Sequence, residues 1–369
     1  MEIVLLVVAL GLILVGAELF TNGIEWFGHR LNLAEGAVGS VLAGIATALP
    51  ETLIPVIAIL VPVLAGHHAP ASAEIGVGAI LGAPFMLATL AMFVTGSAIL
   101  LFSRGGRRSV QVSANPRVLA RDLAFFAIAY LVVIGTAFLP AGLGLLRWLV
   151  AGGLLVTYAA YVRAHFGDES GTTDAATLNR LHATRLQPRR PADEIELLPH
   201  GHAASDPAAA PRLRVIVVQV LLALGLIVLG AQVFVGAVED LAGVIGLDPR
   251  ILALIIAPIA TELPEQSNSV LWVRAGKDTL AMGNITGAMV FQSCLPTILG
   301  ILFTEWTFGP QSALAFASAG AAFVSIALIF GPMLRRGRLT AWSLLWGAPI
   351  YVTYVAAALL LPVGANAVH

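Results

Sequence analysis

The chain has 369 residues, of which 58% are hydrophobic and 11% charged, and its formal net charge is −1. Soluble domains carry about 25% charged residues, so this composition excludes a disordered chain, a nucleic-acid-binding protein with a basic face and most soluble enzymes. The one cysteine, Cys294, excludes an intrachain disulfide and a cysteine-based zinc site. The composition is typical of an integral membrane protein.

Ten apolar segments along the chain are long enough to cross a bilayer, which takes about 20 helical residues. We expect helices at residues 3–27, 33–64, 74–102, 117–139, 142–165, 212–238, 249–273, 279–304, 310–334 and 339–361. Several segments exceed that length, which allows tilt or a break. We therefore predict an all-α membrane protein with a first five-helix unit at 1–165, a polar linker at 166–211 and a second five-helix unit at 212–369.

The basic residues predict the orientation of these spans. With ten spans, all of the 20 Lys and Arg residues except Arg147 and Arg250 fall on one side of the membrane. An excess of Lys and Arg marks the cytoplasmic side. The linker is therefore expected in the cytoplasm and both termini outside, with the plasma (inner) membrane as the expected location.

The two halves of the chain repeat each other. With a shift of 214 residues, residues 9–13 (ALGLI) read onto 223–227 (ALGLI), and residues 45–51 (IATALPE) read onto 259–265 (IATELPE). Five spans per half is an odd number, so the second half crosses the membrane in the opposite sense to the first. Such inverted repeats are typical of secondary transporters, whose substrate site lies where interrupted helices from both halves meet.

The repeated motif contains the strongest candidates for a site. Glu51 and Glu265 are repeat partners inside apolar spans, where a carboxylate is costly and indicates function. Thr47 and Thr261 precede them by four residues and share their helix faces. Proline cannot donate to the carbonyl four residues earlier, so Pro50 and Pro264 free the carbonyls of Ala46 and Ala260. These hard oxygen ligands favour calcium, sodium or magnesium, with Glu51 and Glu265 as the metal ligands.

Further polar residues near the motif extend this prediction. Glu262 lies three residues before Glu265, on the same face, and Asn284 and Gln292 in the eighth span offer amide oxygens to a cation. Glu18 and Asn268 are candidates for a secondary or proton-binding site, although Glu18 also fits a helix-packing role. For Thr47 and Thr261, packing against their own helices is an equally good interpretation.

These motifs resemble those of the sodium/calcium exchanger family, within the calcium:cation antiporters. The resemblance covers roughly residues 4–102 and 215–304 and implies ten spans in two inverted repeats. Each repeat of the family carries Gly-Thr-Ser-x-Pro-Glu on its second helix, matched here at residues 47–51 and 261–265. Its third helix carries Gly-Asn-x-x-Gly-Ser-Asn, whose spacing is kept at residues 78–82 and 283–287. The glycines of these segments, Gly76, Gly78, Gly82, Gly283 and Gly287, are expected to allow close helix approach.

The chain departs from the family pattern at several ligand positions. Ala48 and Glu262 replace the motif serines, Ala79 replaces the first asparagine, and Leu87 and Gln292 replace a further polar ligand. Neutral oxygens are thus lost and one acid is added. Crowded carboxylates share protons, so these changes favour proton coupling over the coupling to three sodium ions that is usual in the family.

We therefore expect a secondary antiporter, not an enzyme, that exchanges Ca²⁺ or a similar divalent cation for Na⁺ or H⁺ by alternating access. Its expected partners are membrane lipid and inorganic cations, with no cofactor and no nucleic acid. A transport-inactive relative that serves as a membrane scaffold or cation sensor is the main alternative, because several family ligands are missing. A channel and a membrane enzyme are weaker alternatives, since the repeat favours a transporter and no plausible nucleophile–base pair is present.

Overall fold

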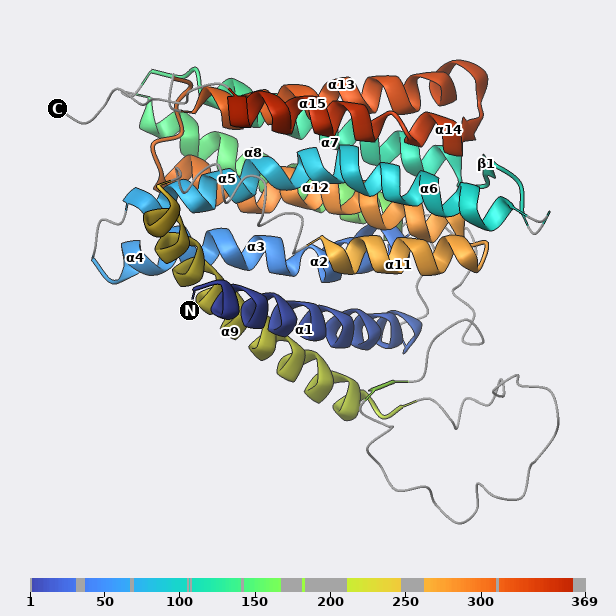
Figure 1. Ribbon diagram of the computed structural model, residues 1–369, viewed down its shortest axis with the longest axis horizontal. Helices are drawn as coiled ribbons and strands as arrows, with labels where there is room; N and C mark the ends of the chain where they lie inside the picture. Colours follow the sequence, from blue (N-terminus) through green and yellow to red (C-terminus); the bar gives the residue numbers. More distant parts are fainter. Residues whose placement is uncertain are drawn as a thin grey trace, which may run out of the picture.

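The computed structural model describes residues 2–30, 37–66, 70–104, 106, 108–140, 143–166, 181–182, 211–246, 262–309 and 312–360. Long helices that run roughly along one direction build the protein (Figure 1). Eight of the described helices are long and apolar enough to cross a membrane, and a shorter apolar stretch covers Glu51–Leu64. The prediction of an all-α membrane protein is thereby confirmed.

In the first half of the chain, α1 (Glu2–Arg30) is continuous, whereas the segment expected as one helix at 33–64 is not. That segment is built from π-helix η1 (Ala37–Ala43), α2 (Gly44–Thr47), α3 (Leu49–Pro55), π-helix η2 (Val56–Leu60) and α4 (Val61–Leu64). Proline lacks the N–H that continues a helix, and π-helical turns take up the displaced hydrogen bonds. Pro50 at the start of α3 and Pro55 at its end therefore account for interruptions that the sequence analysis expected only in general terms.

The remaining helices of this half are α5 (Pro70–Met86), which continues through η3 (Leu87–Ala91) into α6 (Met92–Ser103), then α7 (Pro116–Thr136) and α8 (Gly144–Phe166). The second half contains α9 (Leu213–Ile245), α11 (Leu263–Arg274), α12 (Asp278–Phe303), α13 (Ala313–Arg336), α14 (Ala341–Leu344) and α15 (Gly347–Leu360). The span expected at 249–273 is described only from residue 262 onward, and the expected last span is divided between α14 and α15.

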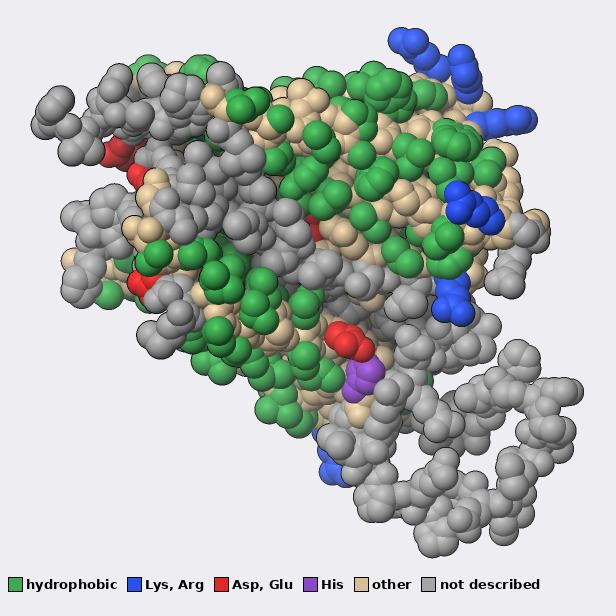
Figure 2. All heavy atoms as spheres, viewed as in Figure 1, with side chains coloured by type: hydrophobic (Ala, Val, Ile, Leu, Met, Phe, Trp, Pro, Cys, Tyr) green, Lys and Arg blue, Asp and Glu red, His purple; other side chains and the backbone are tan. Residues whose placement is uncertain are grey.

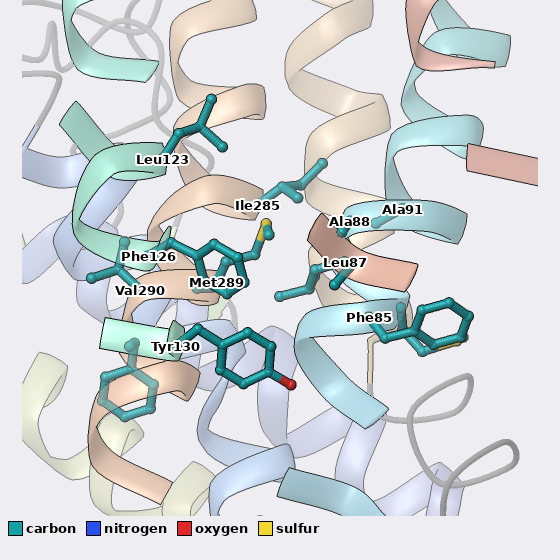
Figure 3. Close-up of a cluster of buried hydrophobic side chains, with 14 of the residues drawn as sticks. Phe85, Leu87, Ala88, Ala91, Leu123, Phe126, Tyr130, Ile285, Met289 and Val290 are labelled. Carbon is teal, nitrogen blue, oxygen red and sulfur yellow. The ribbon is translucent and has the colours of Figure 1, made fainter. Parts of the chain in front are cut away.

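Helix α12 is the centre of the bundle. Within its apolar stretch 78% of the residues are buried, against 17% for α8. It packs against α7, α8, α11, η1 and α5. Figure 3 shows part of the resulting core, where Leu87 faces Met289 of α12 and Phe126 and Tyr130 of α7. The Phe85 ring points away from them and packs against Tyr351 and Tyr354. Because α12 is surrounded by other helices, few of its apolar residues are exposed, whereas α8 exposes Trp148, Leu149 and Val156.

On the face shown in Figure 2, hydrophobic side chains cover much of the described surface. Large side chains such as Ile128, Leu131 and Leu222 expose about 60% or more of their area. A soluble monomer rarely exposes a continuous apolar surface of this extent. Together with the apolar helices, this surface identifies an integral membrane protein.

The basic side chains of the face shown in Figure 2 gather at one end of the helices. The described helix ends agree, since Arg104 follows α6, Arg117 begins α7, Arg163 lies in the last turn of α8 and Arg274 ends α11. At this end two short strands not expected from sequence, β1 (Gln111–Val112) and β2 (Leu339–Thr340), pair antiparallel with Gln111 opposite Thr340.

An ion pair fastens the loop between α6 and α7 to the start of α12. Arg108 Nη2 lies 2.7 Å from Asp278 Oδ2, and the same oxygen accepts a 2.8 Å hydrogen bond from the Ser113 N–H. Arg108 Nη1 also donates to the Val273 carbonyl at 2.7 Å. Because Asp278 is 2% exposed, its charge depends on these donors for compensation.

Among the described helices, α1 and α9 form the most extensive pair, and they lie together along one side of the bundle (Figure 1). Glycines let the two backbones approach. A Cβ placed on Gly16 would lie 3.0 Å from the Ala223 carbonyl oxygen, and a Cβ on Gly230 would lie 3.0 Å from the Ala9 carbonyl oxygen. The two contacts are related by the 214-residue shift found in the sequence.

Candidate functional site

The first repeated motif lies at a break in its span. Thr47 is the last residue of α2, Ala48 separates the helices with φ −80° and ψ 3°, and Glu51 stands in the first turn of α3. Thr47 and Glu51 therefore belong to consecutive short helices rather than to one continuous helix face. Thr47 is fully buried and Glu51 is 3% exposed.

The second motif has a related geometry. Helix α11 begins at Leu263, so Glu265 also stands in the first turn of a helix. The N–H groups of a first turn are unpaired within the helix and carry partial positive charge, which stabilises negative charge nearby. Glu262 precedes the helix, and its carbonyl accepts a 3.0 Å hydrogen bond from the Gln266 N–H. Both Glu262 and Glu265 are fully buried.

The three carboxyl groups gather in one region. Glu262 interacts electrostatically with both Glu51 and Glu265, and Glu265 interacts with Glu51. Among the residues with described positions, no three acidic, histidine or cysteine side chains are placed to hold one metal ion by themselves. A cation bound here therefore needs further oxygen ligands besides the carboxylates.

A hydrogen bond between the two halves of the chain supplies such oxygens. Thr47 Oγ1 lies 3.1 Å from Asn284 Oδ1 and 2.9 Å from the Ala43 carbonyl, and it donates its one proton between these acceptors. Asn284 Nδ2 donates to the Glu265 carbonyl at 3.3 Å. Asn284 is fully buried, and these two hydrogen bonds link α2 to α11 through its side chain.

Buried polar atoms near the carboxylates are left without hydrogen bonds. Within the described part of the chain, neither carboxyl oxygen of Glu262 or of Glu265 has a hydrogen-bond partner, and both amide atoms of Gln292 lack one as well. Gln292 is 1% exposed on α12. Buried polar groups are nearly always paired in folded proteins, so unpaired carboxyl and amide oxygens fit a site for a cation.

Close approach of the backbones holds the helices around this region. A Cβ on Gly44 would lie 2.9 Å from the Ala288 nitrogen, and a Cβ on Gly287 would collide with the Ser40 carbonyl. Gly283 and Gly76 are similarly close to Ser40 and Ile59. The expectation that these glycines allow close packing is confirmed for Gly76, Gly283 and Gly287.

The other candidate residues lie in different places. Glu18 is 73% exposed on α1, and one of its carboxyl oxygens lies 3.5 Å from His182 Nε2. Asn268 is partly buried on α11, one turn after Glu265, and Ala46 contributes backbone to α2. Thr261 and Ala260 lie outside the described residues.

Two polar residues that the sequence did not single out are buried in the structure, one beside the candidate site and one apart from it. Ser269, one turn after Glu265, is fully buried; its hydroxyl donates to the Ala281 carbonyl at 3.1 Å and lies 3.5 Å from Asn284 Nδ2. Asp122 on α7 is also fully buried and accepts several hydrogen bonds. An acid within the span expected at 117–139 was the available signal for Asp122, and the sequence analysis overlooked it.

An apolar helical bundle with buried acids and unpaired amide oxygens in its interior defines a membrane protein of the ion-transporter class. The sequence pattern described as "Sodium/calcium exchanger protein" matches residues 1–167 and 215–360. The chain therefore belongs to the sodium/calcium exchanger family, a family of ion exchangers, and the resemblance seen in the motifs is confirmed.

Comparison with individual proteins agrees with this membership. The chain is 30% identical over 122 residues to the putative antiporter CaxA of Alkalimonas amylolytica, an alignment that covers 33% of this chain and 37% of that relative. The H⁺/Ca²⁺ exchanger CAX is similar in structure, with a TM-score of 0.71, 15% identity and coverage of 98% of this chain and 82% of the exchanger. The sodium-calcium exchanger NCX_Mj gives a TM-score of 0.60, 15% identity and coverage of 97% and 99%. These structures share the fold.

Proposed function

We propose that the protein is a secondary active antiporter that exchanges Ca²⁺, or a similar divalent cation, for H⁺ by alternating access. The observation that carries this proposal is the buried group of Glu51, Glu262 and Glu265, beside the Thr47–Asn284 hydrogen bond that joins the two halves of the chain. Exchangers of calcium for sodium and for protons use the same fold, which supports cation exchange by this chain.

In this proposal Glu51 and Glu265 bind the divalent cation directly. The hydroxyls of Thr47 and Thr261, the carbonyls of Ala46 and Ala260, and the side-chain oxygens of Asn284 and Gln292 complete the ligand shell. Hard oxygen ligands of this kind match the preference of Ca²⁺ for six to eight oxygens. The unpaired amide of Gln292 and the unpaired carboxyl oxygens of Glu265 are the structural support for this assignment.

Protons are the proposed counter-ion because of the third acid. When the divalent cation leaves, three buried carboxylates remain close together, and proton binding removes their mutual repulsion. Glu262 stands where the family motif has a serine, so it adds a group that carries a proton in place of a neutral oxygen. Sodium remains the second candidate counter-ion, since the exchanger NCX_Mj shares the fold.

The proposed topology has ten spans in two inverted repeats, with units at 1–165 and 212–369, a cytoplasmic linker at 166–211 and both termini outside the plasma membrane. The equivalent contacts of Gly16 and Gly230 support the repeat, because residues related by the 214-residue shift occupy equivalent places. The gathering of arginines at one end of the helices supports the orientation.

Calcium flux into proteoliposomes with imposed proton or sodium gradients tests the proposal. We expect uptake driven by a proton gradient and abolished in Glu51→Gln and in Glu265→Gln, with circular dichroism and gel-filtration behaviour unchanged. Exchange for sodium with no response to pH would contradict the proton coupling. Ion currents that need no counter-ion would indicate a channel, and calcium-dependent thermal stabilisation without flux would indicate a cation sensor.

A further inference from the structure

A second buried polar cluster lies away from the glutamates, among α7, α8, α12 and η1. Its centre is the Asp122 carboxylate, which is fully buried. Ser40 Oγ donates to Asp122 Oδ2 at 3.0 Å, Thr286 Oγ1 donates to the same oxygen at 2.6 Å, and Tyr161 OH donates to Oδ1 at 3.1 Å. His165 Nε2 lies 3.0 Å from Oδ1.

The imidazole of His165 has acceptors beside both ring nitrogens. Nδ1 lies 3.1 Å from the Tyr161 carbonyl oxygen, which only accepts, so Nδ1 carries a proton in this bond. Nε2 faces the Asp122 oxygen within ion-pair distance, although it makes no hydrogen bond of good geometry among the described residues. A neutral ring would turn the Nε2 lone pair toward the carboxylate, which is repulsive. A proton on Nε2 makes the contact attractive.

We propose that Asp122 and His165 form a proton-binding site, separate from the glutamate cluster, in which the proton rests on His165 Nε2 beside the ionised Asp122. The proton comes from water at the arginine-rich end of the bundle, where α7 begins and α8 ends. No other bond is made or broken. Because Asp122 is fully buried, loss of this proton leaves its negative charge without the neighbouring positive charge of His165.

The hydroxyl groups around Asp122 have alternative acceptors. Tyr161 OH also lies 3.2 Å from the Ser40 carbonyl oxygen, and Thr286 Oγ1 lies 3.0 Å from the Met282 carbonyl oxygen. Each hydroxyl has one proton, so it donates either to Asp122 or to its backbone acceptor. When the charge on Asp122 changes, the hydroxyls of Tyr161 and Thr286 can therefore turn from Asp122 to these backbone oxygens.

The other charged or titratable neighbours of this pair within the described residues are on α7 and α8. Tyr161 belongs to the network, Tyr158 stacks near Tyr161, and Arg121 Nη1 donates to the Ala164 carbonyl at 2.8 Å. From η1 and α12 the groups that face Asp122 are the hydroxyls of Ser40 and Thr286, which carry no charge. Arg121 is engaged with a backbone oxygen one residue before His165, so the imidazolium is the cation in contact with Asp122.

The site touches both helices that lead to the proposed cation ligands. Ser40 belongs to η1, which continues into α2 with Thr47, and Thr286 lies two residues from Asn284 on α12. Proton binding at Asp122 and His165 therefore acts on the contact between η1 and α12. This effect on exchange rests on the proposed antiport, whereas the proton site itself does not.

Nitrogen-15 NMR of protein labelled at its 8 histidines tests the site directly. His165→Gln assigns the signal. At neutral pH we expect His165 to be protonated on both nitrogens in the wild type and neutral in Asp122→Asn. Thr286→Val, which keeps the carboxylate, retains the protonated signal. His182→Gln, which removes the partly buried histidine beside Glu18, leaves the signal unchanged. A neutral His165 in the folded wild type overturns the proposal.

Infrared spectroscopy keeps the test decisive if Asp122→Asn does not fold. In His165→Gln the compensating cation is gone, so Asp122 takes up the proton and a protonated carboxyl band appears that the wild type lacks. In the His165→Gln variant that also carries Asp122→Glu the band shifts in frequency, because a glutamic acid carboxyl replaces the aspartic acid carboxyl. If no new band appears in folded His165→Gln, the pair does not hold a proton. Calcium flux is not needed for either readout, so failure of the antiport proposal is seen separately.

Discussion

Gly16 and Gly230 occupy equivalent positions in the crossing of α1 and α9. A Cβ on Gly16 would lie 2.8 Å from Ile227 Cγ1, and a Cβ on Gly230 would lie 2.8 Å from Ile13 Cγ1. Ile13 and Ile227 are related by the 214-residue shift, as are Gly16 and Gly230. Each glycine therefore contacts the isoleucine of the other half of the chain in the same way. The duplication found in the sequence is expressed here as a pair of matching contacts.

Alanine at Gly16 or Gly230 is expected to destabilise the protein by about 1–3 kcal/mol, because the backbone and the isoleucine must both move. Thermal unfolding in detergent measures the effect. Gly11→Ala and Gly225→Ala are matched controls, since these glycines are also related by the shift and have no neighbour within 4 Å of an added Cβ. Equal losses in all four variants would show that the close approach is not the cause.

Thr47→Val is expected to weaken divalent cation binding and to lower stability by about 1–3 kcal/mol, because the buried Asn284 Oδ1 loses its hydroxyl donor. Thr47→Ser keeps the hydroxyl and should restore most of both properties. Isothermal titration with Ca²⁺ and thermal unfolding measure them separately. If the valine and serine variants behave alike, the hydroxyl has no part in the site.

Gln292→Leu is expected to stabilise the protein in the absence of calcium while weakening calcium binding. The buried amide of Gln292 has no hydrogen bond within the described residues, so an apolar replacement removes an uncompensated polar group. Thr95→Val is the control, because the Thr95 hydroxyl is likewise buried without a partner in the described residues but belongs to α6. It should raise the melting temperature and leave calcium binding unchanged.

Stabilisation of the purified protein by calcium is expected to increase with pH. The cation binds ionised carboxylates, so its binding releases protons, and its apparent affinity rises as the proton concentration falls. Glu262→Gln removes one of the competing groups and should make the dependence on pH less steep. The shift in melting temperature with calcium, measured over a series of pH values, tests this. A shift that is constant with pH would argue against proton competition.

Asp278→Ala is expected to destabilise the protein by about 3–5 kcal/mol, since Arg108 then loses its partner at a largely buried site. The double variant Arg108→Ala, Asp278→Ala should lose less stability than the sum of the losses of the two single variants. A double-mutant cycle in thermal unfolding measures this coupling. Calcium binding at saturating concentration should be unaffected, because the pair lies at the end of α12.

The amino-acid sequence was sufficient to predict the membrane class and the family, and it placed the motif glutamates inside apolar spans, where the structure buries them. These properties depend on local patterns: apolar runs of sufficient length, acids inside them and a motif that recurs after 214 residues. The break between Thr47 and Glu51 was predicted less well. Proline indicates that a helix is interrupted, but the resulting π-helical and α-helical segments depend on how neighbouring helices accept the displaced turns.

The tertiary structure alone decided which distant residues meet. Thr47 contacts Asn284 across 237 positions of the chain, and Asp122 gathers Ser40, Tyr161, His165 and Thr286 from three other stretches of sequence. Tyr161 and His165 are one helical turn apart, but no local pattern indicates that η1, α8 and α12 meet at Asp122. By itself the sequence determined that this is a membrane ion exchanger with acids in its interior. Only the packing of α7, α8 and η1 around α12 determined where the second buried carboxylate finds its donors.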